Sequence, residues 1–190
     1  MIHILTGAYR IWEPPTGFSR VELDLGCGKG GFLLAMAGKD PASLYLGADV
    51  MLGRLRRVQR KIERRSLTNV ALLRVNAWDL AGHLLPDHCL HRAHILCPDP
   101  WPKARHRSKR LVTSEFLGRL AQKIAPGGVV HLSTDNANYL AAMRAAIAPL
   151  DAYHSYPDGI ADIGAIKTDF EREFEDQGLT VTHLAFAVKH

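Results

Sequence analysis

The chain has 190 residues, 47% of them hydrophobic and 23% charged, with a formal net charge of +5 and an isoelectric point near 9.3. This length and composition predict one domain over residues 1–190 with its own core. Within it, residues 1–20 form a short N-terminal segment of uncertain structure. No apolar run approaches the roughly 18 residues of a membrane span and no signal region is evident, so we expect a cytoplasmic protein. Three cysteines without CxxC spacing favour neither disulfides nor a zinc–thiolate site. The positive net charge suggests a polyanionic partner.

Strands and helices alternate along the chain. Apolar runs predict strands at 21–25, 44–50, 70–75, 93–97, 129–133 and near 179–188. Helical periodicity predicts helices at 30–37, 51–65, 114–124, 138–147 and near 168–177, with a short helical stretch at 77–83. This alternation predicts an α/β fold in which helices cover both faces of a parallel sheet.

A glycine-rich turn follows the first predicted strand. It reads Asp24-Leu-Gly26-Cys-Gly28-Lys-Gly-Gly31, with four glycines in six residues. Glycines in such a turn allow a ligand to lie against the backbone. Gly26, Gly28 and Gly31 also satisfy the dinucleotide pattern G-x-G-x-x-G, so a nicotinamide cofactor is one interpretation.

Polar residues at the strand ends favour S-adenosylmethionine over a dinucleotide. Asp24 can bind the ammonium group of a methionine moiety and would repel a pyrophosphate. Asp49, at the end of the second strand, can hold a ribose, and Asn76, at the end of the third, can hydrogen-bond an adenine edge. Asp49 has an alternative role as a cap of helix 51–65.

The most distinctive stretch is Pro98-Asp99-Pro100-Trp101-Pro102. The prolines fix the backbone on either side of Asp99 and present its carboxylate on a stiff turn. Trp101 either packs under this loop or stacks on a base. Five cations follow, and we expect them to contact RNA phosphates unless they form only a solvated loop. These cations are Lys103, Arg105, Arg107, Lys109 and Arg110.

Other polar clusters leave alternatives open. Seven Lys or Arg residues within 54–65 make helix 51–65 either a phosphate-facing surface or a solvated face. Asp135, after the fifth strand, binds a guanine edge or caps the next helix. Thr168 and Glu171 contact the base or form a capping box. The histidines and cysteine within 83–94 fit no common structural zinc site, so no metal is expected.

The motifs together resemble the tRNA (guanine-N7)-methyltransferase family, from about Val21 to Ala187. The resemblance lies in Asp24-Leu-Gly-Cys-Gly-Lys-Gly, Gly47-Ala-Asp49-Val, Pro98-Asp-Pro-Trp-Pro-Lys103-x-Arg105-His106, Thr134-Asp135 and Thr168-Asp-Phe-Glu171. It implies a Rossmann-like class I methyltransferase fold. Such a fold has a mostly parallel seven-stranded sheet, an antiparallel last strand and helices on both faces.

The resemblance also implies the chemistry and its residues. S-adenosylmethionine would be the cofactor and tRNA the partner, with direct in-line methyl transfer to guanine N7. The implied cofactor residues are Asp24, Gly26, Gly28, Asp49 and Asn76. The implied guanine-site residues are Lys103, Asp135, Thr168 and Glu171, and Asp99 is the expected catalytic residue, also in contact with the cofactor. The phosphate contacts would be Arg105, Arg107, Lys109 and Arg110.

The chain departs from the family pattern at four of these motifs. Asp24 and Asp49 stand where Glu is usual, Asn76 where Asp is usual, and Asp169 where Lys is usual. A methyltransferase of the same fold acting on another RNA or a small substrate is therefore an alternative. A second alternative is a non-catalytic module that binds RNA or cofactor. The sequence leaves monomer and homodimer equally open.

Overall fold

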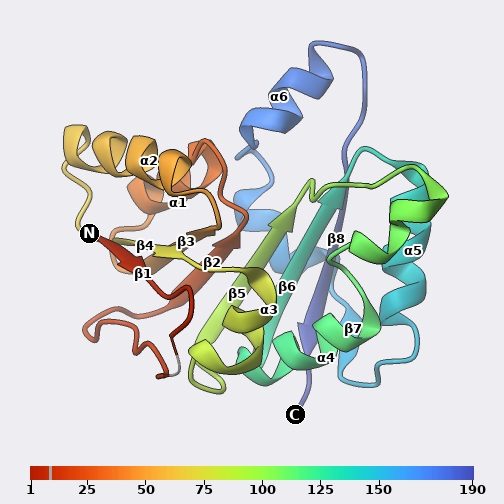
Figure 1. Cartoon of the computed structure of the whole chain (residues 1–190), viewed down its shortest axis with the longest axis horizontal. Coiled ribbons are helices and arrows are strands. Elements are labelled where there is room, and N and C mark those ends of the chain that lie inside the picture. The colour runs from red at the N-terminus through yellow and green to blue at the C-terminus, as the bar shows by residue number, and fades with distance from the viewer. Residues whose placement is uncertain (9) are drawn as a thin grey trace.

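The computed structural model describes residues 1–8 and 10–190, and within them eight strands form one sheet. The strands are β1 (Ile2–Ile4), β2 (Val21–Leu25), β3 (Leu44–Asp49), β4 (Val70–Arg74), β5 (Leu90–Leu96), β6 (Ile124–Thr134), β7 (Tyr153–Ser155) and β8 (Thr182–Val188). Their order across the sheet is β1-β4-β3-β2-β5-β6-β8-β7 (Figure 1). All neighbouring pairs are parallel except those of β8, which runs antiparallel to β6 and to β7.

Helices connect the strands and cover both faces of the sheet (Figure 1). They are α1 (Gly31–Lys39), α2 (Leu52–Arg64), α3 (Ala77–Asp79), α4 (Ser114–Lys123), α5 (Ala137–Ile147) and α6 (Asp169–Glu175). A π-helical turn follows α3 at Leu80–Leu84, and 3₁₀ helices occupy Ala104–Lys109 and Pro157–Ile163. None of the helices in the described part of the chain is long and apolar enough to cross a membrane.

Two hydrophobic clusters form the core, one on each face of the sheet. The larger includes Phe116 of α4 and Tyr139 of α5, and the smaller includes Phe32 of α1 and Leu55 of α2. Strand β2 is buried between the two clusters, and its apolar and acidic residues alternate. Leu23 and Leu25 face the larger cluster, whereas Glu22 and Asp24 are buried on the opposite face. The centre of the sheet therefore carries buried polar side chains on the α1 face.

The topology places a crevice at the carboxyl end of β2. From β2 the chain passes outward to β3 and β4 and then returns to β5, so β2 lies between β3 and β5. In open α/β sheets, ligands bind at such a switch point, outside the carboxyl ends of the strands. The residues after β2, β3, β5 and β6 all lie along this edge.

The prediction of a mostly parallel sheet with helices on both faces is confirmed, but the number of strands was wrong. The sheet has eight strands rather than the seven that the resemblance implies. The apolar runs predicted six of them and missed β1, which pairs with β4, and β7, which pairs with β8. The fifth predicted strand also begins earlier, at Ile124, and includes the Pro126-Gly127-Gly128 turn. At Gly128 a Cβ atom would lie 2.9 Å from the His91 carbonyl oxygen, so only glycine allows β6 to pass β5 this closely.

Candidate functional site

The glycine turn joins β2 to α1 through three residues in left-handed conformations. Gly26, Gly28 and Gly30 have φ of +86°, +53° and +78°, which other L-residues rarely adopt. The turn is tied to β3, because Gly26 N–H donates to the Ala48 carbonyl at 2.8 Å. This bond holds the ends of β2 and β3 together, and the carboxylates of Asp24 and Asp49 are close enough to repel each other.

Asp24 is a buried carboxyl group on the polar face of β2. Only 6% of the residue is exposed. Burial, together with the negative charges of Asp49 and Asp169, raises the pKa of Asp24 to about 7. A cationic group placed among these three acids would relieve their repulsion, so the site favours a positively charged ligand.

Asp49 has one oxygen occupied by the protein and one left for a ligand. Its Oδ1 accepts a hydrogen bond from Met51 N–H at 2.8 Å, before the first turn of α2. Its Oδ2 is buried and has no hydrogen-bond partner among the described residues, although Arg54 Nη1 lies 3.6 Å away. A buried, unpaired acceptor carries a free-energy cost that a ligand hydroxyl would remove. The predicted capping role of Asp49 is wrong, because the N-cap of α2 is Met51 and no side chain caps this helix, whereas the ribose contact remains a prediction.

Asn76 caps the short helix α3. Its Oδ1 accepts from Asp79 N–H at 2.8 Å, and its amide nitrogen donates to the Asp79 carboxylate. The side chain lies at the end of β4, as predicted, but its amide group is engaged by its own helix. An adenine contact remains a prediction.

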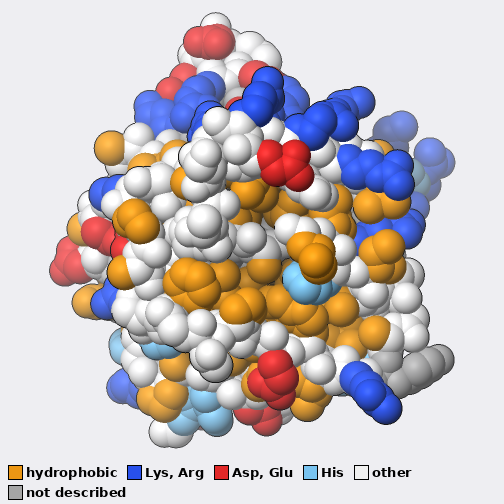
Figure 2. Space-filling view, turned by 90° about the vertical axis from the view of Figure 1, so that its left-hand side faces the viewer, with side chains coloured by type: hydrophobic (Ala, Val, Ile, Leu, Met, Phe, Trp, Pro, Cys, Tyr) orange, Lys and Arg blue, Asp and Glu red, His pale blue; other side chains and the backbone are white. Residues whose placement is uncertain are grey.

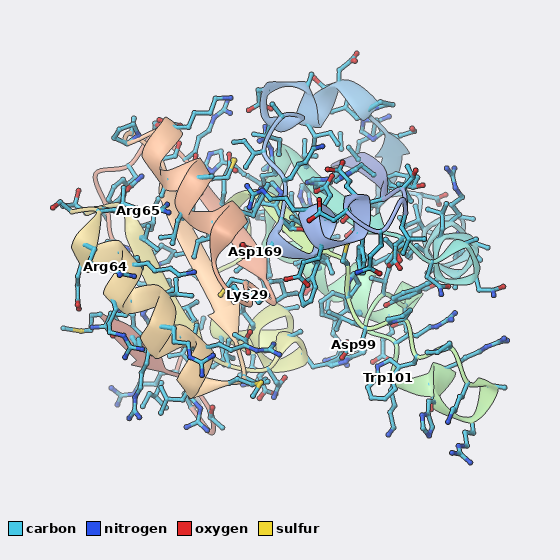
Figure 3. The ribbon with its side chains drawn as sticks, turned by 90° about the horizontal axis from the view of Figure 1, so that it is seen from above. Lys29, Arg64, Arg65, Asp99, Trp101 and Asp169 are labelled. Carbon is cyan, nitrogen blue, oxygen red and sulfur yellow. The ribbon has the colours of Figure 1, made fainter. Side chains whose placement is uncertain are left out.

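Helix α6 lies across the glycine turn. Asp169 Oδ2 accepts a hydrogen bond from Gly31 N–H at 3.0 Å, and Lys29 Nζ is paired with Glu173 Oε1 at 2.5 Å (Figure 3). A Cβ atom at Gly31 would lie 2.6 Å from the Asp169 carboxylate oxygens, so the fourth glycine of the motif makes room for α6. The hollow that remains between α6 and the turn measures about 30 Å³. The C-terminal segment therefore closes over the glycine turn.

Thr168 and Glu171 form the capping box of α6. Thr168 Oγ1 accepts from Glu171 N–H at 2.9 Å, and Glu171 Oε2 accepts from Thr168 N–H at 3.3 Å. Glu171 is buried, and its second oxygen, Oε1, lies 3.1 Å from His183 Nε2. The capping role is thus confirmed, and a guanine contact by these two residues remains a prediction.

Backbone strain flanks the Pro-Asp-Pro loop. Cys97 and Trp101, on either side of Pro98-Asp99-Pro100, have φ of +46° and +41°. Left-handed conformations cost non-glycine residues about 1–2 kcal/mol each. Cys97 N–H donates to the Ser133 carbonyl at 3.0 Å, which holds one end of the loop to β6. This strain presents Asp99, which is exposed at the carboxyl end of β5, across from Lys29 and Asp169 (Figure 3).

The cations after Trp101 divide into two kinds. Lys103, Arg105, Arg107 and Lys109 are exposed, in or beside the 3₁₀ helix Ala104–Lys109. Lys109 Nζ lies 4.9 Å from the centre of the Trp101 ring, and His106 meets the same ring edge-on. Trp101 therefore packs within the loop, as one of its two predicted roles requires.

Arg110 does not fit the predicted phosphate contact. It is buried, its guanidinium lies 4.7 Å over the Tyr139 ring, and its Nε donates to the Pro100 carbonyl at 2.8 Å. A side chain in this position cannot follow a phosphate backbone from the surface. Arg110 instead holds the Asp99 loop against α5.

Asp135 follows β6 and does not cap the next helix. The cap of α5 is Asn136, whose Oδ1 accepts from Tyr139 N–H at 2.9 Å. Asp135 and Glu171 both lie near Cys97. Burial raises the pKa of the Cys97 thiol to about 11, and the negative charges of Asp135 and Glu171 add to this rise, whereas a hydrogen bond with Ser133 opposes it. The β5 loop, the end of β6 and α6 thus meet at one place.

Helix α2 turns its cations outward. Leu55, Val58 and Ile62 are buried, while the arginines of residues 54–65 are exposed. Lys and Arg side chains gather along the upper edge of the face that carries α2, above an apolar area (Figure 2). Arg64 and Arg65 point away from Asp99 at the far end of this helix (Figure 3). Both predicted roles of this helix remain open.

Three polar residues were not singled out from the sequence: Glu22 and His131, which are buried, and His183, which is partly exposed. His131 and His183 connect His94 with Glu171 through hydrogen bonds, and Glu22 contacts His94 at the other end. Their only signal in the sequence is a polar residue inside a run of apolar strand residues. Within the described residues, no group of three or more His, Cys, Asp or Glu side chains is placed to hold a metal ion.

Comparison with known proteins identifies similar sequences and folds. A family model described as a putative methyltransferase matches residues 19–184. The chain is 32% identical over 201 residues to a tRNA (guanine-N(7)-)-methyltransferase of Alkalilimnicola ehrlichii, covering 97% of this chain and 82% of that protein. It is 34% identical over 177 residues to the enzyme of the same name from Methylococcus capsulatus, covering 90% and 76%.

Solved structures agree on the fold. The 16S rRNA methyltransferase KamB superimposes with a TM-score of 0.68 at 17% identity, covering 92% of this chain and 90% of KamB. The aminoglycoside resistance methyltransferase NpmB1 gives a TM-score of 0.63 at 19% identity, covering 91% and 89%. At these identities the likeness concerns the arrangement of strands and helices alone.

Proposed function

This chain belongs to the tRNA (guanine-N7)-methyltransferase family, and from that premise we propose that it methylates N7 of a guanine in tRNA, using S-adenosylmethionine, in the cytoplasm where tRNA is processed. The observation that carries the proposal is the meeting of two sets of residues at one sheet edge. The glycine turn with Asp24 and Asp49 ends β2 and β3, and the Asp99 loop ends the adjacent strand β5.

The residues at the glycine turn fit S-adenosylmethionine. When bound, this cofactor supplies a methyl group activated by a positively charged sulfur. Asp24 would hold its ammonium group, and the unpaired Oδ2 of Asp49 would accept from a ribose hydroxyl. The negative charges of Asp24, Asp49 and Asp169 suit a ligand that carries two positive charges. A pyrophosphate would meet repulsion at the same place.

Methylation of guanine N7 requires the protein to align the two reactants, and no proton has to be removed from the nucleophile. N7 carries an in-plane lone pair and no proton, so no general base is required. Alignment of two reactants can contribute about 7–11 kcal/mol in well-oriented systems. The strained loop around Asp99, held by Arg110 and Ser133, is a stiff platform for this purpose.

Acidic residues around the loop would select guanine. Asp99 and Asp135 can accept hydrogen bonds from guanine N1–H and its exocyclic amine, whereas adenine offers an unprotonated N1. A paired contact of this kind discriminates between bases by about 1–3 kcal/mol. Methylation leaves a positive charge on the base, which Asp99 and Glu171 would stabilise. Lys103, Arg105, Arg107 and Lys109 would hold the surrounding phosphates.

The test is transfer of labelled methyl from S-adenosylmethionine to unmodified tRNA transcripts, with analysis of the released nucleosides. We expect 7-methylguanosine. Transcripts made with 7-deazaguanosine provide the matched control, because they keep the shape of tRNA but lack the N7 nucleophile, and should accept no label. Label in any other nucleoside, or label in the 7-deaza transcripts, would refute methylation at N7.

A further inference from the structure

A row of five side chains crosses the sheet beneath α1 and α6. Glu22 of β2, His94 of β5, His131 of β6, His183 of β8 and Glu171 of α6 follow one another, and we call them the histidine row. The linking distances are 3.2 Å from Glu22 Oε2 to His94 Nε2, and 3.0 Å between the Nδ1 atoms of His94 and His131. They continue with 2.9 Å from His131 Nε2 to His183 Nδ1, and 3.1 Å from His183 Nε2 to Glu171 Oε1.

The row is built into the centre of the fold. His94 and His131 are directly opposite one another on neighbouring strands, and the Phe32 ring of α1 covers His94 edge-on. His94 is 1% exposed and His131 is 3% exposed. Buried polar groups cost free energy unless each is hydrogen-bonded, and apolar side chains at these strand positions would pack without that cost. The row is therefore expected to serve the site that it reaches.

A count of protons shows what the row requires. Its five members make four links, and each link needs one hydrogen between two lone-pair atoms. A carboxylate supplies none and a neutral imidazole supplies one. Three neutral rings thus provide three hydrogens for four links, and the row is complete only when it holds one proton more.

The surroundings decide which ring holds this proton. Burial lowers the pKa of His94, although Glu22 opposes the effect, and burial lowers the pKa of His131 still further. His183 has a side chain that is 30% exposed, and its Nε2 faces the carboxylate of Glu171. The imidazolium form is therefore least costly at His183, where it makes an ion pair.

Charged neighbours at both ends agree with this placement. Arg92 Nη1 lies 3.7 Å from Glu22 Oε2, and the same guanidinium is paired with Asp162 at 3.1 Å, so a positive charge already adjoins the Glu22 end of the row. At the other end, Arg144 lines the same hollow as His183, and Asp135 lies with Glu171 near Cys97.

We propose that His183 is a positioning residue for Glu171, acting as an imidazolium that the histidine row holds in place. It fixes Oε1 of Glu171 in the guanine site, a role that rests on the proposed function. Loss of the extra proton opens the link between His183 and Glu171. This link opens, rather than the one at Glu22, because water can replace the lost bond only at the exposed end.

The proton count itself can be tested without any enzymatic reaction. In protein labelled with ¹⁵N-histidine, NMR distinguishes protonated from unprotonated ring nitrogens. We expect His94 with hydrogen on Nε2 alone, His131 with hydrogen on Nδ1 alone, and His183 with both nitrogens protonated at neutral pH. In Glu171→Gln the amide can donate the fourth hydrogen itself, so His183 should carry hydrogen on Nδ1 alone. A neutral His183 throughout the neutral range, or the opposite tautomers at His94 and His131, would overturn the proposal.

The positioning role is tested by His183→Gln, which keeps a side-chain donor but cannot become an imidazolium. We expect KM for tRNA to rise about tenfold at neutral pH, as for a lost hydrogen bond to a charged group, with unchanged S-adenosylhomocysteine affinity. The wild-type rise in KM at alkaline pH should disappear. His154→Gln, on an exposed histidine of β7, is the matched control and should change neither quantity. An unchanged KM in folded His183→Gln would refute positioning, whereas failure to methylate any tRNA would refute the proposed function and leave the NMR result standing.

Discussion

Replacing Asp24 by Asn should make the protein more stable while weakening its hold on the cofactor. The pKa of Asp24 rises from 3.8 to about 7, first because the carboxyl is buried and then because of Asp49 and Asp169. Between these two pH values the folded chain keeps a proton that the unfolded chain has lost. The stability that protonated Asp24 contributes is therefore present at low pH and is lost as the pH rises from 3.8 toward 7.

The size of the effect follows from the two pKa values. Each pKa unit corresponds to about 1.36 kcal/mol, so the full shift amounts to about 4 kcal/mol at pH 8. At pH 5 the unfolded state has gained only about 2 kcal/mol from ionisation of this carboxyl group. Asparagine has nearly the same shape and never ionises. Asp24→Asn should thus gain more stability at pH 8 than at pH 5, by about 2–3 kcal/mol.

Urea unfolding of cofactor-free protein at the two pH values measures this difference. Asp151→Asn, which removes an exposed acid, is the matched control and should change stability little at either pH. Calorimetric titration with S-adenosylhomocysteine should show weaker binding by Asp24→Asn. If the variant were less stable than the wild type, or gained equally at pH 5 and pH 8, the assignment of a raised pKa to Asp24 would be refuted.

Three further results are expected. Cofactor affinity should rise with pH up to about 7 and then level off, because Asp24 must be ionised to attract an ammonium group; a flat calorimetric profile from pH 5.5 to 8.5 would contradict this. Asp99→Asn should lower kcat by about a hundredfold or more while leaving cofactor affinity nearly intact, as single-turnover and binding assays would show. Reversing the charge of Arg105 and Arg107 should reduce the slope of log K for tRNA against log salt by about 2, whereas Arg119→Glu on α4 should not change it.

Much of the sheet could be predicted because its strands are buried on both sides. Such strands appear in the sequence as short apolar runs, and the turn glycines mark where β2 ends. Strands β1 and β7, with three residues each, are too short to show any period. Strand β1 is defined by its pairing with β4, which lies about 70 residues further along the chain. Contacts at that separation leave no local signal, so the apolar runs predicted six of the eight strands and missed β1 and β7.

The position of a polar side chain could be predicted wherever it lies at the carboxyl end of a strand. Asp24, Asp49, Asp99 and Asp135 all lie along the predicted edge, because the carboxyl ends of parallel strands meet there. Arg110 was misjudged because five neighbouring cations look equivalent in sequence. Only the Tyr139 ring, supplied by α5, separates it from the rest.

Helix α6 contacts both the glycine turn and the histidine row, so a displacement of this helix affects both. Asp169 accepts a hydrogen bond from Gly31 N–H at the glycine turn, and Glu171, two residues later, lies 3.1 Å from His183 of β8. The capping box between Thr168 and Glu171 makes this first turn rigid. A movement of α6 large enough to break the Asp169 bond must also draw Glu171 away from His183, because the two side chains share one turn of helix. The space over the glycine turn and the alignment of Glu171 are consequently coupled by the seven residues Asp169–Glu175.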